Sequence, residues 1–121
     1  MSKGIKVINV NDGELRELKG GLRSRRIITK KSVGSEKLMV GIATCDPGKG
    51  HDWHCHVDGQ EEVLYIVEGE VTVTWIEDGL EKKLVAKKGD CIFSPSGVEN
   101  KIVNTGNTQL IMVACIVPPP E

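Results

Sequence analysis

The residues of this sequence best suited to chemistry are a cluster of histidines and carboxylates. His51, His54 and His56 are the only histidines of the chain, and Glu61 and Glu62 follow closely. In a β-strand, residues two apart point to the same face, so the imidazoles of His54 and His56 would project together. Two imidazoles and a carboxylate suit a divalent metal such as Mn, Fe, Co, Ni or Zn. The same residues would also fit an exposed polar loop, because short motifs often match by chance.

Short β-rich runs surround this cluster. From Lys37 onward, such runs alternate with Gly, Pro, Asn and Asp, a spacing typical of an all-β sandwich or barrel. The pair Asp78-Gly79 between two of these runs predicts a β-hairpin with a tight turn. The best helical candidate is the segment 11–20, which has a capping Asn or Asp and two leucines three apart. We therefore expect an all-β fold with under about 15% helix.

A basic run, RSRRIITKK, occupies residues 23–31. One interpretation is a solvent-exposed or edge strand, whose charges discourage aggregation between sheets. The other is that one of its guanidinium groups contacts an anionic substrate. The sequence alone leaves both interpretations open.

Length and composition indicate one small domain, residues 1–121. The formal net charge of −1 gives no sign of a nucleic-acid partner. No stretch approaches the roughly 20 apolar residues that cross a bilayer, and the first residues lack the features of a signal peptide. We therefore expect a cytoplasmic protein with no membrane partner. The four cysteines form no CxxC pair and are expected to be free thiols.

Two segments resemble the paired motifs of the cupin family. The first, GKGHDWHCHVDGQEEVLYIVEG (48–69), reads as Gly, five residues, HxH, a short gap, Glu, six residues and Gly. The second, GDCIFSPSGVENKIVN (89–104), reads as Gly, five residues, PxG, two residues, a position usually held by histidine, three residues and Asn. The resemblance places Gly69 and Gly89 in turns, where a missing Cβ permits positive φ.

The resemblance implies one double-stranded β-helix, or jelly-roll barrel, whose mouth holds a single divalent transition metal. It assigns three of the family's ligand positions to His54, His56 and Glu62. The fourth ligand of the family, a histidine, falls at Asn100 in this sequence. His51 has the opposite strand parity to the other two histidines, so it would reach the metal only if the chain bends.

Two departures from the family pattern leave alternatives for the ligand set. The gap between His56 and Glu62 is longer than the family usually shows, so Gln60 and Glu61 remain competing ligands. Strand alternation favours Glu62. At the second departure, an amide oxygen is a weaker donor than imidazole for most of these metals. Asn100 therefore coordinates through its carbonyl oxygen, orients a bound water, or does not touch the metal.

The resemblance also implies a function. It favours a metal-dependent isomerase, lyase or dioxygenase acting on a small polar metabolite that the metal chelates. The alternative is a non-catalytic module that binds a small molecule beside a degenerate metal site, since fold does not fix function. We further expect a homodimer, as in many relatives, because a small barrel retains exposed sheet edges. The segment 5–10 or 23–29 would pair across the two-fold axis.

Overall fold

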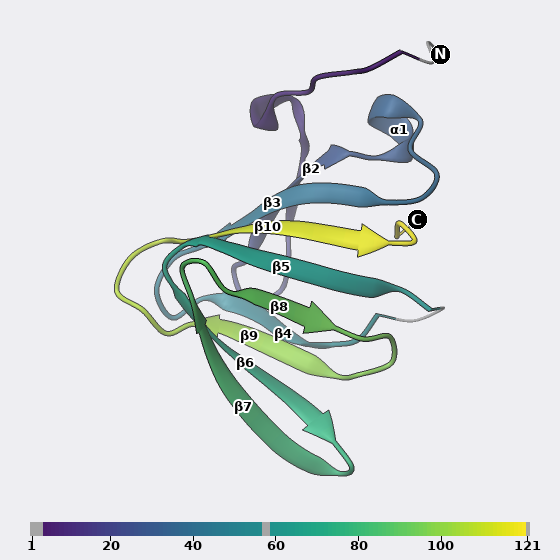
Figure 1. Cartoon of the computed structure of the whole chain (residues 1–121). Helices are drawn as coiled ribbons and strands as arrows, with labels where there is room; N and C mark the ends of the chain where they lie inside the picture. Colours follow the sequence, from purple (N-terminus) through teal and green to yellow (C-terminus); the bar gives the residue numbers. More distant parts are fainter. Residues whose placement is uncertain (1–3, 57–58, 121) are drawn as a thin grey trace.

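The computed structural model describes residues 4–56 and 59–120, so positions 57 and 58 of the first motif lie outside the described residues. The strands form two antiparallel sheets, the jelly-roll arrangement that the sequence predicts (Figure 1). The six-stranded sheet has the order β1-β2-β3-β10-β5-β8, and the four-stranded sheet has the order β4-β9-β6-β7. The elements in chain order are η1 (Val10–Asp12), β1 (Glu14–Glu17), β2 (Arg23–Ile28), α1 (Lys30–Val33), β3 (Met39–Cys45), β4 (Gly50–His54), β5 (Glu61–Glu68), β6 (Glu70–Glu77), β7 (Leu80–Lys87), β8 (Cys91–Ser94), β9 (Asn100–Asn104) and β10 (Leu110–Val117).

Alternating side chains build the core between the two sheets. β3 and β10 bury every second residue, because successive side chains of a strand point to opposite faces. β5 adds Leu64 and Ile66 from the same sheet, and β9 adds Ile102 from the other. The core is therefore aliphatic, and its burial from water holds the sheets together.

Tight turns fix the connections between strands. Asp78 and Gly79 have φ values of 52° and 75°, so the β6–β7 hairpin closes through a turn with two left-handed residues. This confirms the turn predicted from the sequence. Gly69 and Gly89 both have φ of 93°, a conformation that costs glycine little.

The N-terminal third differs from the sequence prediction. The helical prediction for the segment 11–20 is wrong, because a single 3₁₀ turn ends at Asp12 and the next residues form β1. β1 pairs with β2 along its whole length, and this pairing outweighs a weak local helical pattern. β2 also pairs with β3, so most of the basic run lies in an inner strand rather than at a sheet edge. Within the described residues, no helix is long and apolar enough to span a membrane.

Candidate metal and ligand site

The structure brings three of the four predicted metal ligands together. One donor atom each from His54, His56 and Glu62 lies within 4.8 Å of the other two. His54 ends β4, His56 follows it by two residues, and Glu62 lies near the start of β5 in the facing sheet. His56 Nε2 and Glu62 Oε1 are 3.1 Å apart, and both side chains are only 12% exposed. Two separate strands from opposite sheets thus converge on one point.

These donors lie on the wall of a cavity of about 420 Å³, which we call the histidine cavity. Three cationic residues, Arg16, Lys19 and Arg26, line it together with the inner faces of β3, β5, β9 and β10. The cavity is therefore apolar over much of its wall, but its charged groups are concentrated around the histidines and the β1–β2 strands. Its full lining is Arg16, Leu18, Lys19, Leu22, Ser24, Arg26, Met39, Ala43, His51, Asp52, Trp53, His54, His56, Glu62, Leu64, Ile102, Met112, Ala114 and Ile116.

His51 also lies at this cavity, although its strand parity argued against it. The pairing of β4 with β9 shifts register between His51 and His54, and such an irregularity changes which side chains share a face. The two Nδ1 atoms are 3.1 Å apart, and the rings meet edge to face with centroids 4.0 Å apart. The His51 ring also donates to the Asp52 carbonyl oxygen at 2.9 Å. His51 therefore packs against the ring of His54 and restricts its orientation.

The protonation of the three histidines follows from their surroundings. Burial, followed by the charge of His54, lowers the pKa of His51 to about 4. Burial also lowers the pKa of His54. In contrast, the hydrogen bond to Glu62 raises the pKa of His56. Neutral His54 is ready to donate its lone pair to a metal, whereas His56 must first release the proton that it shares with Glu62.

The competing carboxylate and amide of the first motif lie differently. Glu61 is exposed and Gln60 is half-buried before β5 begins, whereas Glu62 lines the histidine cavity. Glu62 shares its parity with Leu64 and Ile66, the buried residues of the same strand. The position of Glu62 is the one that strand alternation favours.

Asn100, the fourth predicted ligand, lies on the strand next to His54. It is buried at the start of β9, where it pairs with His54 on one side and with Trp75 on the other. Its side-chain amide donates to the Val98 carbonyl oxygen at 3.2 Å. Asn100 lines a second cavity and is not among the residues that line the histidine cavity.

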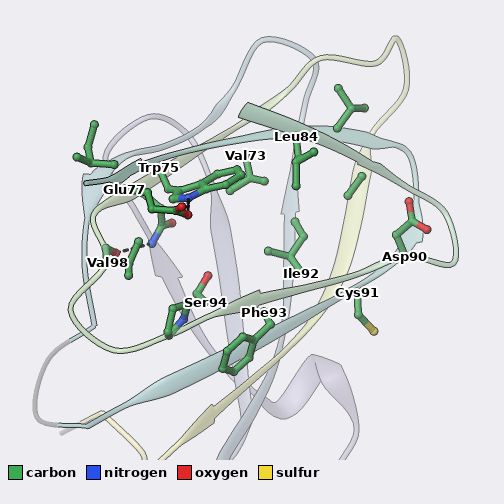
Figure 2. A pocket seen from close by; sticks show the side chains of 15 residues that line it. Val73, Trp75, Glu77, Leu84, Asp90, Cys91, Ile92, Phe93, Ser94 and Val98 are labelled. Atoms are coloured by element: carbon green, nitrogen blue, oxygen red, sulfur yellow. Dashed lines mark hydrogen bonds between the residues drawn. The ribbon is translucent and has the colours of Figure 1, made fainter. Parts of the chain in front are cut away.

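The second cavity has a volume of about 520 Å³ and lies between β6, β7 and β8; we call it the β7–β8 cavity. Figure 2 shows Trp75, Val73, Leu84 and Ile92 around it, with Phe93 nearby. Trp75 donates its indole N–H to Glu77 at 3.1 Å. Apart from Glu77, Asp90, Ser94 and Asn100, the side chains around this cavity are apolar or thiol groups.

The donor set at the histidine cavity fits a divalent transition metal. Two imidazoles and one carboxylate are suitable ligands for such an ion. The carboxylate of Glu62 would offset part of the charge of the metal, and three protein ligands leave positions open for a small molecule. The residues present therefore match the metal that the sequence motif implies.

Two facing antiparallel sheets with a histidine–carboxylate cluster in a cavity between them define a metal-binding jelly-roll protein. The chain belongs to the cupin family, because the profile of the cupin domain matches residues 41–116. It is 30% identical to the oxalate-binding protein of Thermotoga maritima over 82% of this chain and 78% of that protein. It is 29% identical to polyketide synthase CurC of Streptomyces cyaneus, over 93% and 70% of the two chains. The crystal structure of a predicted oxalate decarboxylase from Thermotoga maritima superimposes with a TM-score of 0.76 and 26% identity, covering 93% of this chain and 99% of that one.

Proposed function

We propose that the protein binds one divalent transition metal through His54, His56 and Glu62, and binds a small carboxylate such as oxalate on that metal. The observation that carries the proposal is the convergence of these three donors at the wall of a cavity that also holds three cationic side chains. The metal, when bound, would act as a Lewis acid for the oxygen atoms of the small molecule. The similarity to an oxalate-binding protein supports the same class of ligand.

The protein's own groups have distinct roles in this proposal. Glu62 would supply negative charge to the metal, and without metal it accepts the hydrogen bond of His56. His51 restricts the ring of His54 from the side. Such supporting contacts of metal-binding histidines typically change affinity by about 10- to 100-fold when they are removed.

Metal analysis followed by calorimetry tests the proposal. Untagged protein purified without chelators is analysed for Mn, Fe, Co, Ni and Zn, and metal-loaded and chelator-treated samples are then titrated with oxalate. We expect oxalate to bind only to the metal-loaded protein. The matched variants are Glu62→Gln, which should lose the metal, and Glu61→Gln, which alters the exposed neighbouring carboxylate and should retain it. Metal-independent binding of oxalate, or equal metal affinity in both variants, would count against the proposed site.

Binding and catalysis are separated by the fate of the ligand. Isomerase, lyase and dioxygenase chemistry would each convert the bound molecule, whereas a binding module would return it unchanged. We place binding first because the most similar relative cited above is named for binding. Incubation of the metal-loaded protein with oxalate, followed by NMR and headspace analysis of carbon dioxide, decides between the two. Turnover that depends on Glu62 would establish an enzyme.

We also propose a homodimer formed through the N-terminal segment. Ile5 and Val7 are almost fully exposed, at 101% and 93% of their reference area. β2 already has partners on both sides, so of the two candidate segments 5–10 is the one still able to pair with a second copy. Replacing Ile5 and Val7 with Lys should give a monomer in sedimentation velocity. A monomeric wild-type protein at micromolar concentration would refute the dimer.

A further inference from the structure

We propose that Arg26 is the anion-recognition residue of the histidine cavity and that it binds a carboxylate group of a ligand whose other end chelates the metal. The proposal rests on the proposed function, and it narrows the ligand to a small dicarboxylate. Arg26 is part of the basic run, whose sequence allowed either a solvent-exposed strand or a contact with an anion.

The first support is the state of the guanidinium group. The Nε–H of Arg26 is buried and has no hydrogen-bond partner among the described residues. No acidic side chain of the described part of the chain lies within ion-pair distance of it, although Glu14 lies opposite it on β1. A buried donor without a partner is costly, and arginine is particularly suited to carboxylates because its planar fork matches both oxygens.

The second support is the place of Arg26 in the sheet. Ser24 and Arg26 of β2 line the histidine cavity together with Leu22, the residue just before the strand, as expected for alternate residues of an extended segment. The neighbouring arginines of the strand do otherwise: Arg23 is paired with Glu17 in solvent, and Arg25 donates to the Gly13 carbonyl oxygen. Arg26 is thus the arginine of this strand that faces the metal-binding residues.

The third support is the small size of the side chains that lie between Arg26 and the metal-binding residues. Along the register of the six-stranded sheet, Arg26 pairs with Gly41, Gly41 with Ala114, and Ala114 with Leu64. Leu64 is two residues from Glu62 on the same face of β5. The span from β2 to β5 is three strand spacings, about 14 Å. Of these residues, Ala114 lines the histidine cavity with only a methyl group, which leaves space for a ligand between the guanidinium and the metal-binding residues. The position that a Cβ of Gly41 would take is closed by the backbone of Arg25.

The remaining charges of the cavity agree with an anionic ligand. Arg16 lines the cavity from β1, and Lys19 lies near its edge, where it also pairs with Asp52 at 3.5 Å. Asp52 and Glu62 are the carboxylates that line the cavity; Asp52 pairs with Lys19, and the metal would offset the charge of Glu62. A ligand with two carboxylates, one on the metal and one on Arg26, would balance the cations that line this wall.

Substitution with methionine provides the sharpest test. Arg26→Met keeps much of the length of the side chain but removes the charge and the orphan donor. We expect the metal affinity to stay within about 2-fold, the oxalate affinity of the Mn²⁺-loaded protein to fall by roughly 10- to 100-fold, and the melting temperature of the ligand-free protein to stay equal or rise. Arg23→Met is the matched control on the exposed face of the same strand, and it should change none of the three.

The outcomes separate this inference from the proposed function. If Arg26→Met binds oxalate as tightly as the wild type does, the role of Arg26 is refuted while the metal–carboxylate site stands. A lowered melting temperature would show that the guanidinium supports the fold, which also overturns the proposal. Arg26→Lys keeps the positive charge but replaces the planar guanidinium group with an ammonium group. This variant should bind oxalate more weakly at unchanged metal affinity. Wild-type oxalate affinity in this variant would refute the role of the guanidinium geometry. If the wild type binds metal but no dicarboxylate, the proposed function itself fails.

Discussion

The barrel contains two cavities of similar size that differ in chemistry. The histidine cavity of about 420 Å³ collects three histidines, Glu62 and three cationic residues. The β7–β8 cavity of about 520 Å³ is lined mainly by apolar side chains around Trp75. The border between them is narrow, since His54 and Asn100 are register partners on adjacent strands but line different cavities.

The residues suited to binding a metal and an anion therefore lie in one of the two cavities, and the other cavity is mainly apolar. In the histidine cavity, His56 and Glu62 contact each other, whereas the buried Nε–H of Arg26 has no hydrogen-bond partner among the described residues. In the β7–β8 cavity, the polar groups largely satisfy one another locally, as Trp75 does with Glu77 and Asn100 with the Val98 carbonyl. Buried polar groups that have hydrogen-bond partners nearby support the structure, whereas buried polar groups that lack such partners are candidates for function.

The largest effect should come from removing one metal ligand. His54→Ala should lower the affinity for a divalent metal by more than about 100-fold, because even supporting residues of metal ligands change affinity by 10- to 100-fold. Competitive titration against a chromogenic chelator measures this loss. Leu84→Ala, an exposed position on the wall of the β7–β8 cavity, is the control and should leave the affinity unchanged. Equal losses in both variants would show that the two cavities do not differ in metal binding.

The second effect is a loss of stability in acid. The pKa of His51 falls from 6.5 to about 4 in the folded chain, so the native state binds fewer protons than the unfolded state between these values. Its contribution to stability is therefore present above about pH 6.5 and is lost as the pH falls towards 4, by up to about 3 kcal/mol. His54 acts in the same direction, and His56 acts in the opposite one.

Urea unfolding of the metal-free protein at several pH values measures this dependence. His51→Gln should remove most of the acid destabilisation, because glutamine has no proton to gain. A variant whose free energy of unfolding falls with pH as steeply as that of the wild type would show that another group is responsible.

A third, smaller effect is expected at the border between the cavities. Asn100→His should raise the affinity for Ni, Cu or Zn by about 10-fold or more, because imidazole binds these metals better than an amide oxygen does. The register pairing of Asn100 with His54 brings the two residues onto neighbouring strands, which favours this result. The chelator titration used for His54→Ala measures it. Unchanged affinity would mean that residue 100 does not face the metal, and that it belongs with the β7–β8 cavity alone.

Much of this arrangement could be predicted from the sequence, for physical reasons. Strand alternation favoured Glu62 over Glu61, because the period of two is a property of every strand. The turn at Asp78 and Gly79 was visible because only a few residue types adopt its conformation. Features that depend on pairing between distant strands were not visible.

His51 and Arg26 are examples of such features. The register shift in β4 that brings His51 to the cavity arises from its pairing with β9, and no residue type signals it. The inward position of Arg26 goes with the pairing of β2 with both β1 and β3, and the sequence pattern predicted a helix in place of β1. For both residues the local sequence pattern left the orientation of the side chain open, and the pairing between strands determined which side chain faces the cavity.

The smallest expected effect uses the two tryptophans, since each cavity is lined by one of them. Trp53 lines the histidine cavity next to His54, and Trp75 lines the β7–β8 cavity. Bound Cu²⁺ quenches indole fluorescence with a steep dependence on distance. Trp75 pairs with Asn100, which pairs with His54, so it lies only about 10 Å from the ligand strand, two strand spacings away. We therefore expect Cu²⁺ to quench the Trp75→Phe protein, which retains Trp53, only moderately more than the Trp53→Phe protein. Zn²⁺, which does not quench by this route, serves as the control for conformational change.

Equal quenching, or stronger quenching of Trp75, would place the metal at the border or in the β7–β8 cavity. In that case the separation of the two cavities would be wrong, even if His54→Ala abolished binding.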